Sequence, residues 1–139
     1  MTEIYALSET EIKAQFYDLD PMNVVWHGNY ARYFEQARCD LLDSIGYNYQ
    51  EMEASGYVWP VVDMHVRYLR PITLGQSFIV RSELVEYEFR LKILYTIFDK
   101  NSGEKICKAH TEQVAVDVKT NEMQYGTPLI LAKKLGIDT

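Results

Sequence analysis

Cysteine is scarce in this chain of 139 residues: it occurs only twice, as Cys39 and Cys107. Two isolated cysteines cannot form a disulfide framework, and neither has a second cysteine or a histidine at the spacing of a metal site. The three histidines, His27, His65 and His110, are equally scattered. We therefore expect two reduced thiols in a cytoplasmic protein that needs no metal or other cofactor, with His65 and His110 as structural or surface residues.

Long apolar runs and blocks of basic residues are missing as well. No stretch approaches the roughly 20 apolar residues that cross a bilayer. The N-terminus carries Glu3 and Glu9 where a signal peptide would have a basic region and an apolar core. The formal net charge is −6, and Lys and Arg are not clustered into the positive surface that binds phosphate backbones. The sequence therefore predicts neither a membrane protein nor a nucleic-acid-binding protein.

Internal repeats, low-complexity tracts and flexible linkers are also lacking, so we expect one domain over residues 1–139. A chain of this length with 47% hydrophobic residues can bury a sizeable core. Aromatic residues, by contrast, are plentiful at 13%, with 11 tyrosines. This surplus indicates a pocket or a subunit contact in addition to the core.

Hydrophobic periodicity predicts a strand followed by a long helix. Ile12, Ala14 and Phe16 alternate with polar neighbours, which is typical of a strand with one buried face. Asn29 is then placed to cap a helix, and Gly46 is placed to end it in a left-handed conformation. Between them, apolar residues recur at helical spacing, at Tyr30, Phe34, Ala37, Leu41 and Ile45.

Three charged residues of this helix, Arg32, Glu35 and Arg38, lie three positions apart. At this spacing side chains of opposite charge can pair on one side of a helix. We expect these residues on the polar side, with Glu35 paired to Arg32 or Arg38.

After Gly56 the pattern changes to alternation of period two, which predicts strands over residues 62–68, 78–84, 91–97 and 105–118. Short turns at residues 73–76 and 101–103 join them. A doubly wound fold needs helices between its strands, and none is predicted here. The sequence therefore predicts an α+β fold in which an antiparallel sheet curls around one helix.

The connection between the first strand and the helix holds the residues that are suited to chemistry: Asp18, Asp20 and His27. The first backbone N–H groups of a helix have no partner within the helix and lie at the positive end of its dipole. Such groups can stabilise an oxyanion that forms during acyl transfer. A carboxylate on the same loop can attack a carbonyl or activate a water molecule.

These residues resemble a known family. The pattern Asp-x-Asp-Pro-x-x-Val-Val-x-His-x-Asn-Tyr at residues 18–30, followed by Tyr-Phe-Glu-x-Ala-Arg at residues 33–38, is similar to the 4-hydroxybenzoyl-CoA thioesterase family. The likeness continues through Gly46, residues 66–75, and the stretch from Val116 to Pro128. It implies a hot-dog fold, with an antiparallel sheet of about five strands around one long central helix. It also implies an acyl-CoA thioesterase that assembles as a homodimer or a dimer of dimers.

The resemblance implies a role for several residues of the loop. Asp20 matches the catalytic carboxylate, either as nucleophile or as general base. The backbone N–H groups of His27 and Gly28 match the oxyanion site, and the His27 imidazole is a second catalytic candidate. Asp18 we interpret as a turn former that bonds backbone N–H groups. Asn23 stands where many members have glycine, so we expect it to adopt a left-handed backbone.

Substrate contacts are less clearly marked. Candidates for the acyl pocket are the mostly aromatic residues Trp26, Tyr30, Tyr57, Trp59 and Val61. Candidates for the CoA phosphates are the basic residues Arg67, Arg70, Lys133 and Lys134.

Several other functions stay open from the sequence. One is an acyl-carrier-protein thioesterase with the same chemistry, and another is an acyl-thioester binder without turnover, which the presence of Asp20 disfavours. An enoyl-thioester hydratase is disfavoured, because that branch of hot-dog proteins has its histidine soon after its aspartate, whereas His27 follows Asp20 by seven positions. Glu35 is a rival catalytic carboxylate, since some related thioesterases place theirs on the helix.

Overall fold

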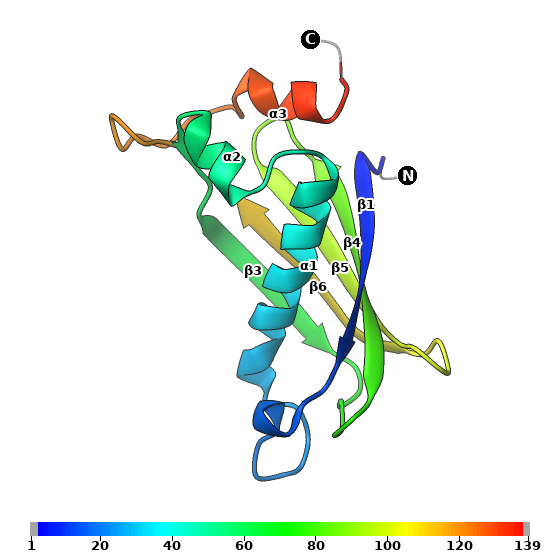
Figure 1. Ribbon diagram of the computed structural model, residues 1–139. Helices are drawn as coiled ribbons and strands as arrows, with labels where there is room; N and C mark the ends of the chain where they lie inside the picture. The colour runs from blue at the N-terminus through cyan, green and yellow to red at the C-terminus, as the bar shows by residue number, and fades with distance from the viewer. Residues whose placement is uncertain (1–2, 138–139) are drawn as a thin grey trace.

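The computed structural model describes residues 3–137. It contains an antiparallel sheet of five strands in the order β1-β4-β5-β6-β3, which curls around the long helix α1 (Figure 1). This arrangement confirms the expected α+β fold. The elements are β1 (Ala6–Lys13), α1 (Tyr30–Ser44), α2 (Tyr49–Ala54), β2 (Tyr57–Val58), β3 (Val61–Tyr68), β4 (Ser77–Glu86), β5 (Leu91–Asp99), β6 (Lys105–Gln113), β7 (Val116–Asp117) and α3 (Leu129–Lys134).

The core forms where the apolar stripe of α1 meets the sheet. Phe34, Ala37 and Leu41 on α1 are fully buried. They share the core with alternate residues of β4 and β5, namely Phe78, Val80, Leu84, Leu91, Ile93 and Ile97. Burying each large apolar side chain stabilises the fold by about 1.5–3 kcal/mol. Gly46 ends the helix region with a φ of 71°, as expected.

The first strand differs from the prediction. It ends at Lys13, and the chain turns into a short 3₁₀ helix, Phe16–Asp18, so that Phe16 is 79% exposed. The reason is local: the Asp18 carboxylate accepts a hydrogen bond from the Gln15 N–H at 2.9 Å, which bends the chain out of the sheet. Ala14 is buried as expected, and Ile12 is partly buried against the core.

The last predicted strand, residues 105–118, is divided in two. β6 ends at Gln113, and β7 leaves the main sheet to pair with β2 in a separate two-stranded sheet. The Gln113 side chain, fully buried, donates from Nε2 to the Trp59 carbonyl at 2.7 Å. This bond ties the end of β6 to the segment that leads into β3.

The polar side of α1 also differs from the prediction. Arg38 is only 7% exposed, and its guanidinium donates to the hydroxyls of Tyr49 at 2.7 Å and Tyr95 at 3.3 Å. Position 38 follows the buried Phe34 by one helical turn and therefore faces the core. Within residues 3–137, Glu35 makes no ion pair with Arg38 or with any other residue. The expected pairing was wrong.

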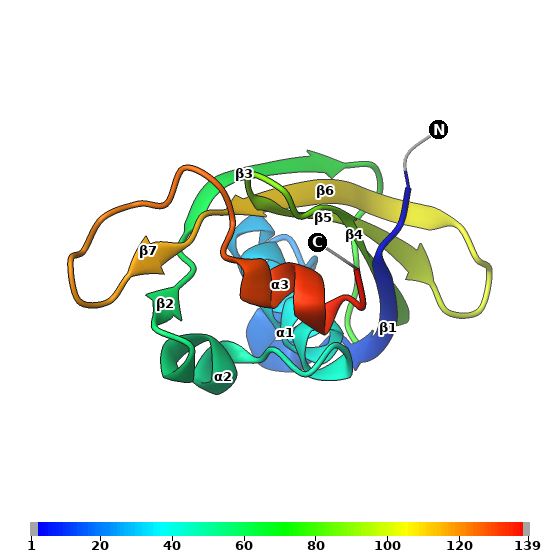
Figure 2. The same ribbon diagram turned by 90° about the horizontal axis from the view of Figure 1, so that it is seen from above.

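β3 is an edge strand with an exposed apolar surface. Val62, Met64 and Tyr68, which alternation placed on a buried face, are 54%, 47% and 49% exposed. α1 and α2 lie on one side of the sheet (Figure 2), and neither helix makes extensive contact with β3. None of the helices in residues 3–137 is long and apolar enough to cross a membrane.

Candidate active site

The loop between β1 and α1 is a small hairpin tied to the rest of the fold. Its arms pair through Leu19 and Val25, and the Asp20 N–H donates to the Val24 carbonyl at 2.8 Å. Val25 in turn donates to the Ile72 carbonyl at 2.8 Å. These bonds give Asp20 a defined position although it lies outside the main sheet.

Asn23 closes the hairpin turn with a φ of 64°, which confirms the expected left-handed backbone. Its N–H donates to the Asp20 carbonyl at 3.0 Å. L-residues adopt this conformation at a cost that asparagine partly avoids. We expect Asn23→Ala to lower the free energy of unfolding by about 1 kcal/mol. Urea denaturation measures this, with Asn23→Gly as the control that stays within about 0.5 kcal/mol of the wild type. Equal stability of all three proteins would contradict the assigned backbone.

The two carboxylates of the loop have different surroundings. Asp18 is buried, and its carboxylate accepts the Gln15 N–H, so its expected role as a turn former is confirmed. Burial, together with the nearby Asp18 carboxylate, raises the pKa of Tyr33. Asp20 is half-buried and accepts the Met22 N–H on Oδ1 at 2.8 Å. Its second oxygen, Oδ2, accepts no hydrogen bond within residues 3–137.

The helix start differs in detail from the prediction. A single 3₁₀ turn, His27–Asn29, precedes α1 and runs directly into it, because the Tyr30 N–H donates to the His27 carbonyl. Asn29 does not cap the helix. Its side chain donates instead to the Asp18 carbonyl at 2.8 Å, which fixes the helix start to the hairpin.

Two backbone N–H groups at this helix start are unused. The amides of His27 and Gly28 donate to no acceptor within the described residues, whereas the Asn29 amide donates to the Trp26 carbonyl at 2.9 Å. These amides lie at the positive end of a helix that continues for 15 residues from Tyr30. The arrangement can accept an anion or a polarised carbonyl oxygen.

A hollow of about 280 Å³ lies beside His27. The Tyr68 hydroxyl donates to the His27 carbonyl at 3.2 Å, and the Tyr30 and Tyr68 rings meet edge to face at 4.9 Å. Burial raises the pKa of Tyr30, so its hydroxyl stays protonated at neutral pH. The hollow is lined by Val25, His27, Tyr30, Tyr68, Leu69, Arg70 and Pro71.

The sequence matches a known family over most of its length. The model of the thioesterase-like superfamily covers residues 14–134. The chain belongs to this superfamily. Among its relatives is the protein YneP of Bacillus subtilis, 31% identical over 112 residues, or 80% of each chain. An acyl-acyl carrier protein thioesterase of Arabidopsis thaliana is 30% identical over 119 residues, which are 85% of this chain and 63% of that one.

Solved structures agree with this superfamily assignment. The crystal structure of the DHNA-CoA thioesterase from Staphylococcus aureus superposes with a TM-score of 0.79 at 33% identity, covering 86% of this chain and 80% of that chain. The thioesterase-like superfamily has the hot-dog fold, so the expected fold is confirmed in its particular form.

Two of the residues expected to contact the substrate, Trp59 and Val61, lie away from the hollow beside His27. Trp59 is 4% exposed in the core, where its Nε1–H donates to the Tyr47 hydroxyl at 3.3 Å. Val61 begins β3 and is therefore roughly 23 Å from Tyr68 at the other end of that strand. Within residues 3–137 of this chain, the structure does not bring Trp59 or Val61 to His27.

The basic candidates are likewise divided. Arg70 lines the hollow beside His27 and also pairs with Glu104 at 3.1 Å. Arg67 lines a different hollow of about 350 Å³, together with Lys105 and Lys108. Lys134 lies near Gly46, at the end of α1 opposite His27. Of the four, only Arg70 is placed with the loop.

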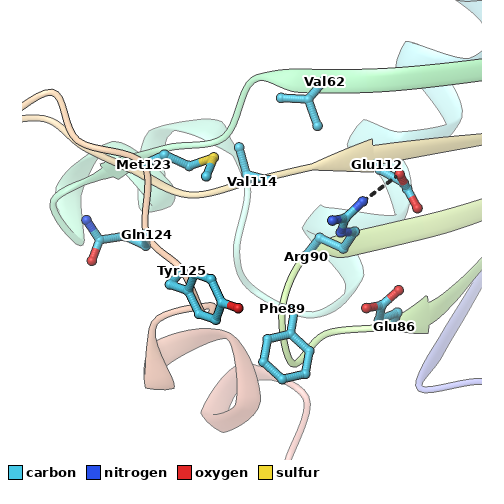
Figure 3. A pocket seen from close by; sticks show the side chains of 9 residues that line it. All are labelled: Val62, Glu86, Phe89, Arg90, Glu112, Val114, Met123, Gln124 and Tyr125. Carbon is cyan, nitrogen blue, oxygen red and sulfur yellow. Dashed lines mark hydrogen bonds and ion pairs between the residues drawn. The ribbon is translucent and has the colours of Figure 1, made fainter.

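A hollow of about 590 Å³ (Figure 3) is lined by residues such as Val62, Glu86 and Glu112, which lie at the strand ends away from the loop between β1 and α1. An ion pair between Arg90 and Glu112 at 3.0 Å crosses it. None of the site residues expected from the sequence lines it. Within residues 3–137, no group of three or more His, Cys, Asp or Glu side chains is arranged to hold a metal ion.

Sequence reasoning missed two contacts at the helix start. One is the bond from the Tyr68 hydroxyl to the His27 carbonyl, for which alternation along β3 gave no signal. The other is the contact between the Trp26 ring and Gly28. The signal for this second contact was available, since a glycine directly before the helix start leaves room for a neighbouring ring.

Proposed function

We propose that this protein hydrolyses acyl-CoA thioesters to a carboxylic acid and free CoA, with Asp20 as the catalytic carboxylate. Membership of the thioesterase-like superfamily supports the reaction class. One observation carries the residue assignment. The hydrogen-bonded loop between β1 and α1 holds the Asp20 carboxylate, one oxygen of which accepts no hydrogen bond within residues 3–137. The same loop holds the amides of His27 and Gly28, which donate to no acceptor within these residues, at the helix start.

The proposed reaction begins with the thioester carbonyl oxygen at the amides of His27 and Gly28. Attack on the carbonyl carbon gives a tetrahedral oxyanion, which these two N–H groups stabilise. If Asp20 is a general base, it takes a proton from water as the hydroxide attacks, and returns that proton to the departing CoA thiolate. If Asp20 is a nucleophile, its oxygen displaces the thiolate to form a mixed anhydride, which water then cleaves.

The His27 side chain has a smaller role in this proposal. His27→Ala keeps the backbone amide, so we expect kcat/KM to fall by less than about tenfold, whereas loss of an oxyanion donor costs about a hundredfold or more. Steady-state thiol release measures the change, and circular dichroism checks that the variant is folded. Complete loss of activity in a folded variant would show that the imidazole itself takes part in the reaction.

We propose further that two copies pair through β3. β3 is one of two edge strands, and it exposes Val61, Val62, Met64 and Tyr68, whereas the other edge strand, β1, exposes mainly charged side chains. Two-fold pairing places the strands antiparallel. The Val61 end of one copy then lies beside the Tyr68 end of the other, next to His27. This proposal gives Val61 a place at the active site of the partner subunit.

The thiol carrier is CoA in this proposal, and acyl-carrier protein is the second candidate. Arg70 beside the hollow supports a site for phosphate groups, which both carriers have. The relative from Arabidopsis thaliana supports the second candidate. The two unpaired cysteines, one of them buried, support a cytoplasmic location.

A thiol-release screen tests the proposed function. Purified protein is incubated with CoA thioesters of short, long, branched and aromatic acids, and with the same acyl groups on acyl-carrier protein. We expect release of free thiol from at least one CoA thioester, faster than from its carrier-protein counterpart. Release only from acyl-carrier protein would favour the second candidate. Absence of thiol release from every substrate would contradict both.

A further inference from the structure

Trp26 has a backbone that is held on both sides and a side chain that is not. Its N–H donates to the Asp18 carbonyl at 2.9 Å, and its carbonyl accepts the Asn29 N–H at 2.9 Å. The side chain is 49% exposed, and its Nε1–H donates to no acceptor within residues 3–137. The ring can therefore rotate about its side-chain bonds without breaking a hydrogen bond of the loop.

The Trp26 ring lies on Gly28. A Cβ atom added to Gly28 would be 2.3 Å from Cζ3 of Trp26, and 2.4 and 2.7 Å from two further ring atoms. The ring therefore occupies the space that any side chain at position 28 would fill. Gly28 has no positive φ that would require glycine. The Trp26 ring can come this close because Gly28 has no side chain.

The Trp26 ring lies close to the helix-start amides that could bind a carbonyl oxygen. Near a helix start, the Cβ direction tilts toward the N-terminus, and the unused N–H groups point the same way. The ring, in the Cβ direction of Gly28, therefore lies beside the path along which a carbonyl oxygen reaches the amides of His27 and Gly28. It also shares a face of the hairpin with Asp20, because Val24 is opposite Asp20 and Trp26 follows two residues later.

We infer that Trp26 is a gate which closes the helix-start amides in the free protein and rotates outward when a thioester binds. Gly28 provides the surface on which the gate rests. The identity of the ligand rests on the proposed function. The resting position of the ring on Gly28 is independent of that function. In this role Trp26 controls the access of substrate to the amides and so influences which acyl groups are accepted. A residue that simply lined the acyl pocket would keep the same position with and without substrate.

Fluorescence tests the gate because the chain has only two tryptophans. Trp59→Phe leaves Trp26 as the single reporter. In this background we expect Gly28→Ala to displace the ring and to raise its quenching by acrylamide about twofold without any ligand. Unchanged quenching in Gly28→Ala would contradict the resting position of the ring.

The same reporter then tests the motion. The probes are CoA thioethers in which a methylene separates the sulfur from a methyl, long-alkyl or phenyl ketone, so that they bind and are not hydrolysed. We expect a bound probe to raise quenching of Trp26 by about as much as Gly28→Ala does, with binding followed by calorimetry. A probe that binds without changing the quenching overturns the gate. If no probe binds, the gate and the proposed function both fail.

The direction in which kcat/KM changes on removal of the Trp26 ring distinguishes a gate from a side chain that lines the acyl pocket. We expect Trp26→Ala to raise kcat/KM for acetyl-CoA by about threefold or more, because a closed resting state lowers apparent affinity by its population. A wall that contacts the acyl group predicts a decrease, and that result would overturn the gate. Tyr17→Ala is the control: Tyr17 is exposed on the same loop, and we expect no change. Hydrolysis by the wild type with a decrease in Trp26→Ala leaves the proposed function intact.

Discussion

Asp20→Asn is expected to lower kcat by at least about a hundredfold, which corresponds to about 2.7 kcal/mol in the activation barrier. The amide oxygen of asparagine can still accept the Met22 N–H, so the hairpin keeps its shape. It cannot take a proton from water or attack a thioester carbonyl at a comparable rate. The measurement is thiol release under saturating substrate, with thermal unfolding to show that the variant is folded.

Two matched controls belong to this experiment. Asp18→Asn makes the same change two residues earlier, at a buried carboxylate that bonds the Gln15 N–H. We expect it to lower stability and to change kcat by less than about fivefold, because the Asp18 carboxylate takes no part in the proposed reaction. Glu35→Gln removes the rival carboxylate on α1, with the same small effect on rate. Wild-type activity in Asp20→Asn, or collapse of activity in Glu35→Gln, would sink the assignment.

Met64→Asp is expected to convert a dimer into monomers and to remove most of the activity. Met64 is in the middle of β3 and 47% exposed, so the proposed pairing buries it. An unpaired carboxylate buried there weakens the dimer by about 2 kcal/mol or more, over tenfold in the dissociation constant. Light scattering after size exclusion measures the mass, and thiol release measures the activity.

Leu7→Asp provides the control for this experiment. Leu7 is 49% exposed on β1, the other edge strand, so the substitution adds the same charge to a surface of similar exposure. We expect it to leave both mass and activity unchanged. A dimer that survives Met64→Asp and dissociates with Leu7→Asp would place the subunit contact on the opposite edge.

Much of the fold could be predicted because it depends on periodicity. The helical stripe of α1 and the alternation along β4 and β5 are local patterns, and the structure confirms both, although Ile45 at the end of the stripe is only partly buried. Edge and central strands show the same alternation, so the sequence could not reveal that β3 leaves Met64 exposed. Arg38 was misplaced because its partners, Tyr49 and Tyr95, lie 11 and 57 residues away. A charged side chain gives no local sign of such distant hydroxyls.

The candidate site was predictable to a similar degree. The motif placed Asp20 and the helix-start amides on one loop, and the left-handed backbone of Asn23 was foreseen from the chemistry of asparagine. The cap at Asn29 was wrong, because its side chain finds the Asp18 carbonyl instead of a helix amide. Trp59 and Val61 were chosen for their residue type alone. Their distance from His27 follows from the length of β3, which a residue type does not encode.

Hydrolysis in water enriched in ¹⁸O is the most direct test of the central claim, that this loop hydrolyses a thioester with water. Over many turnovers we expect one ¹⁸O atom in each released carboxylic acid and one equivalent of free CoA, both lost in Asp20→Asn. Intact thioester after prolonged incubation, or free CoA without labelled acid, would contradict the account.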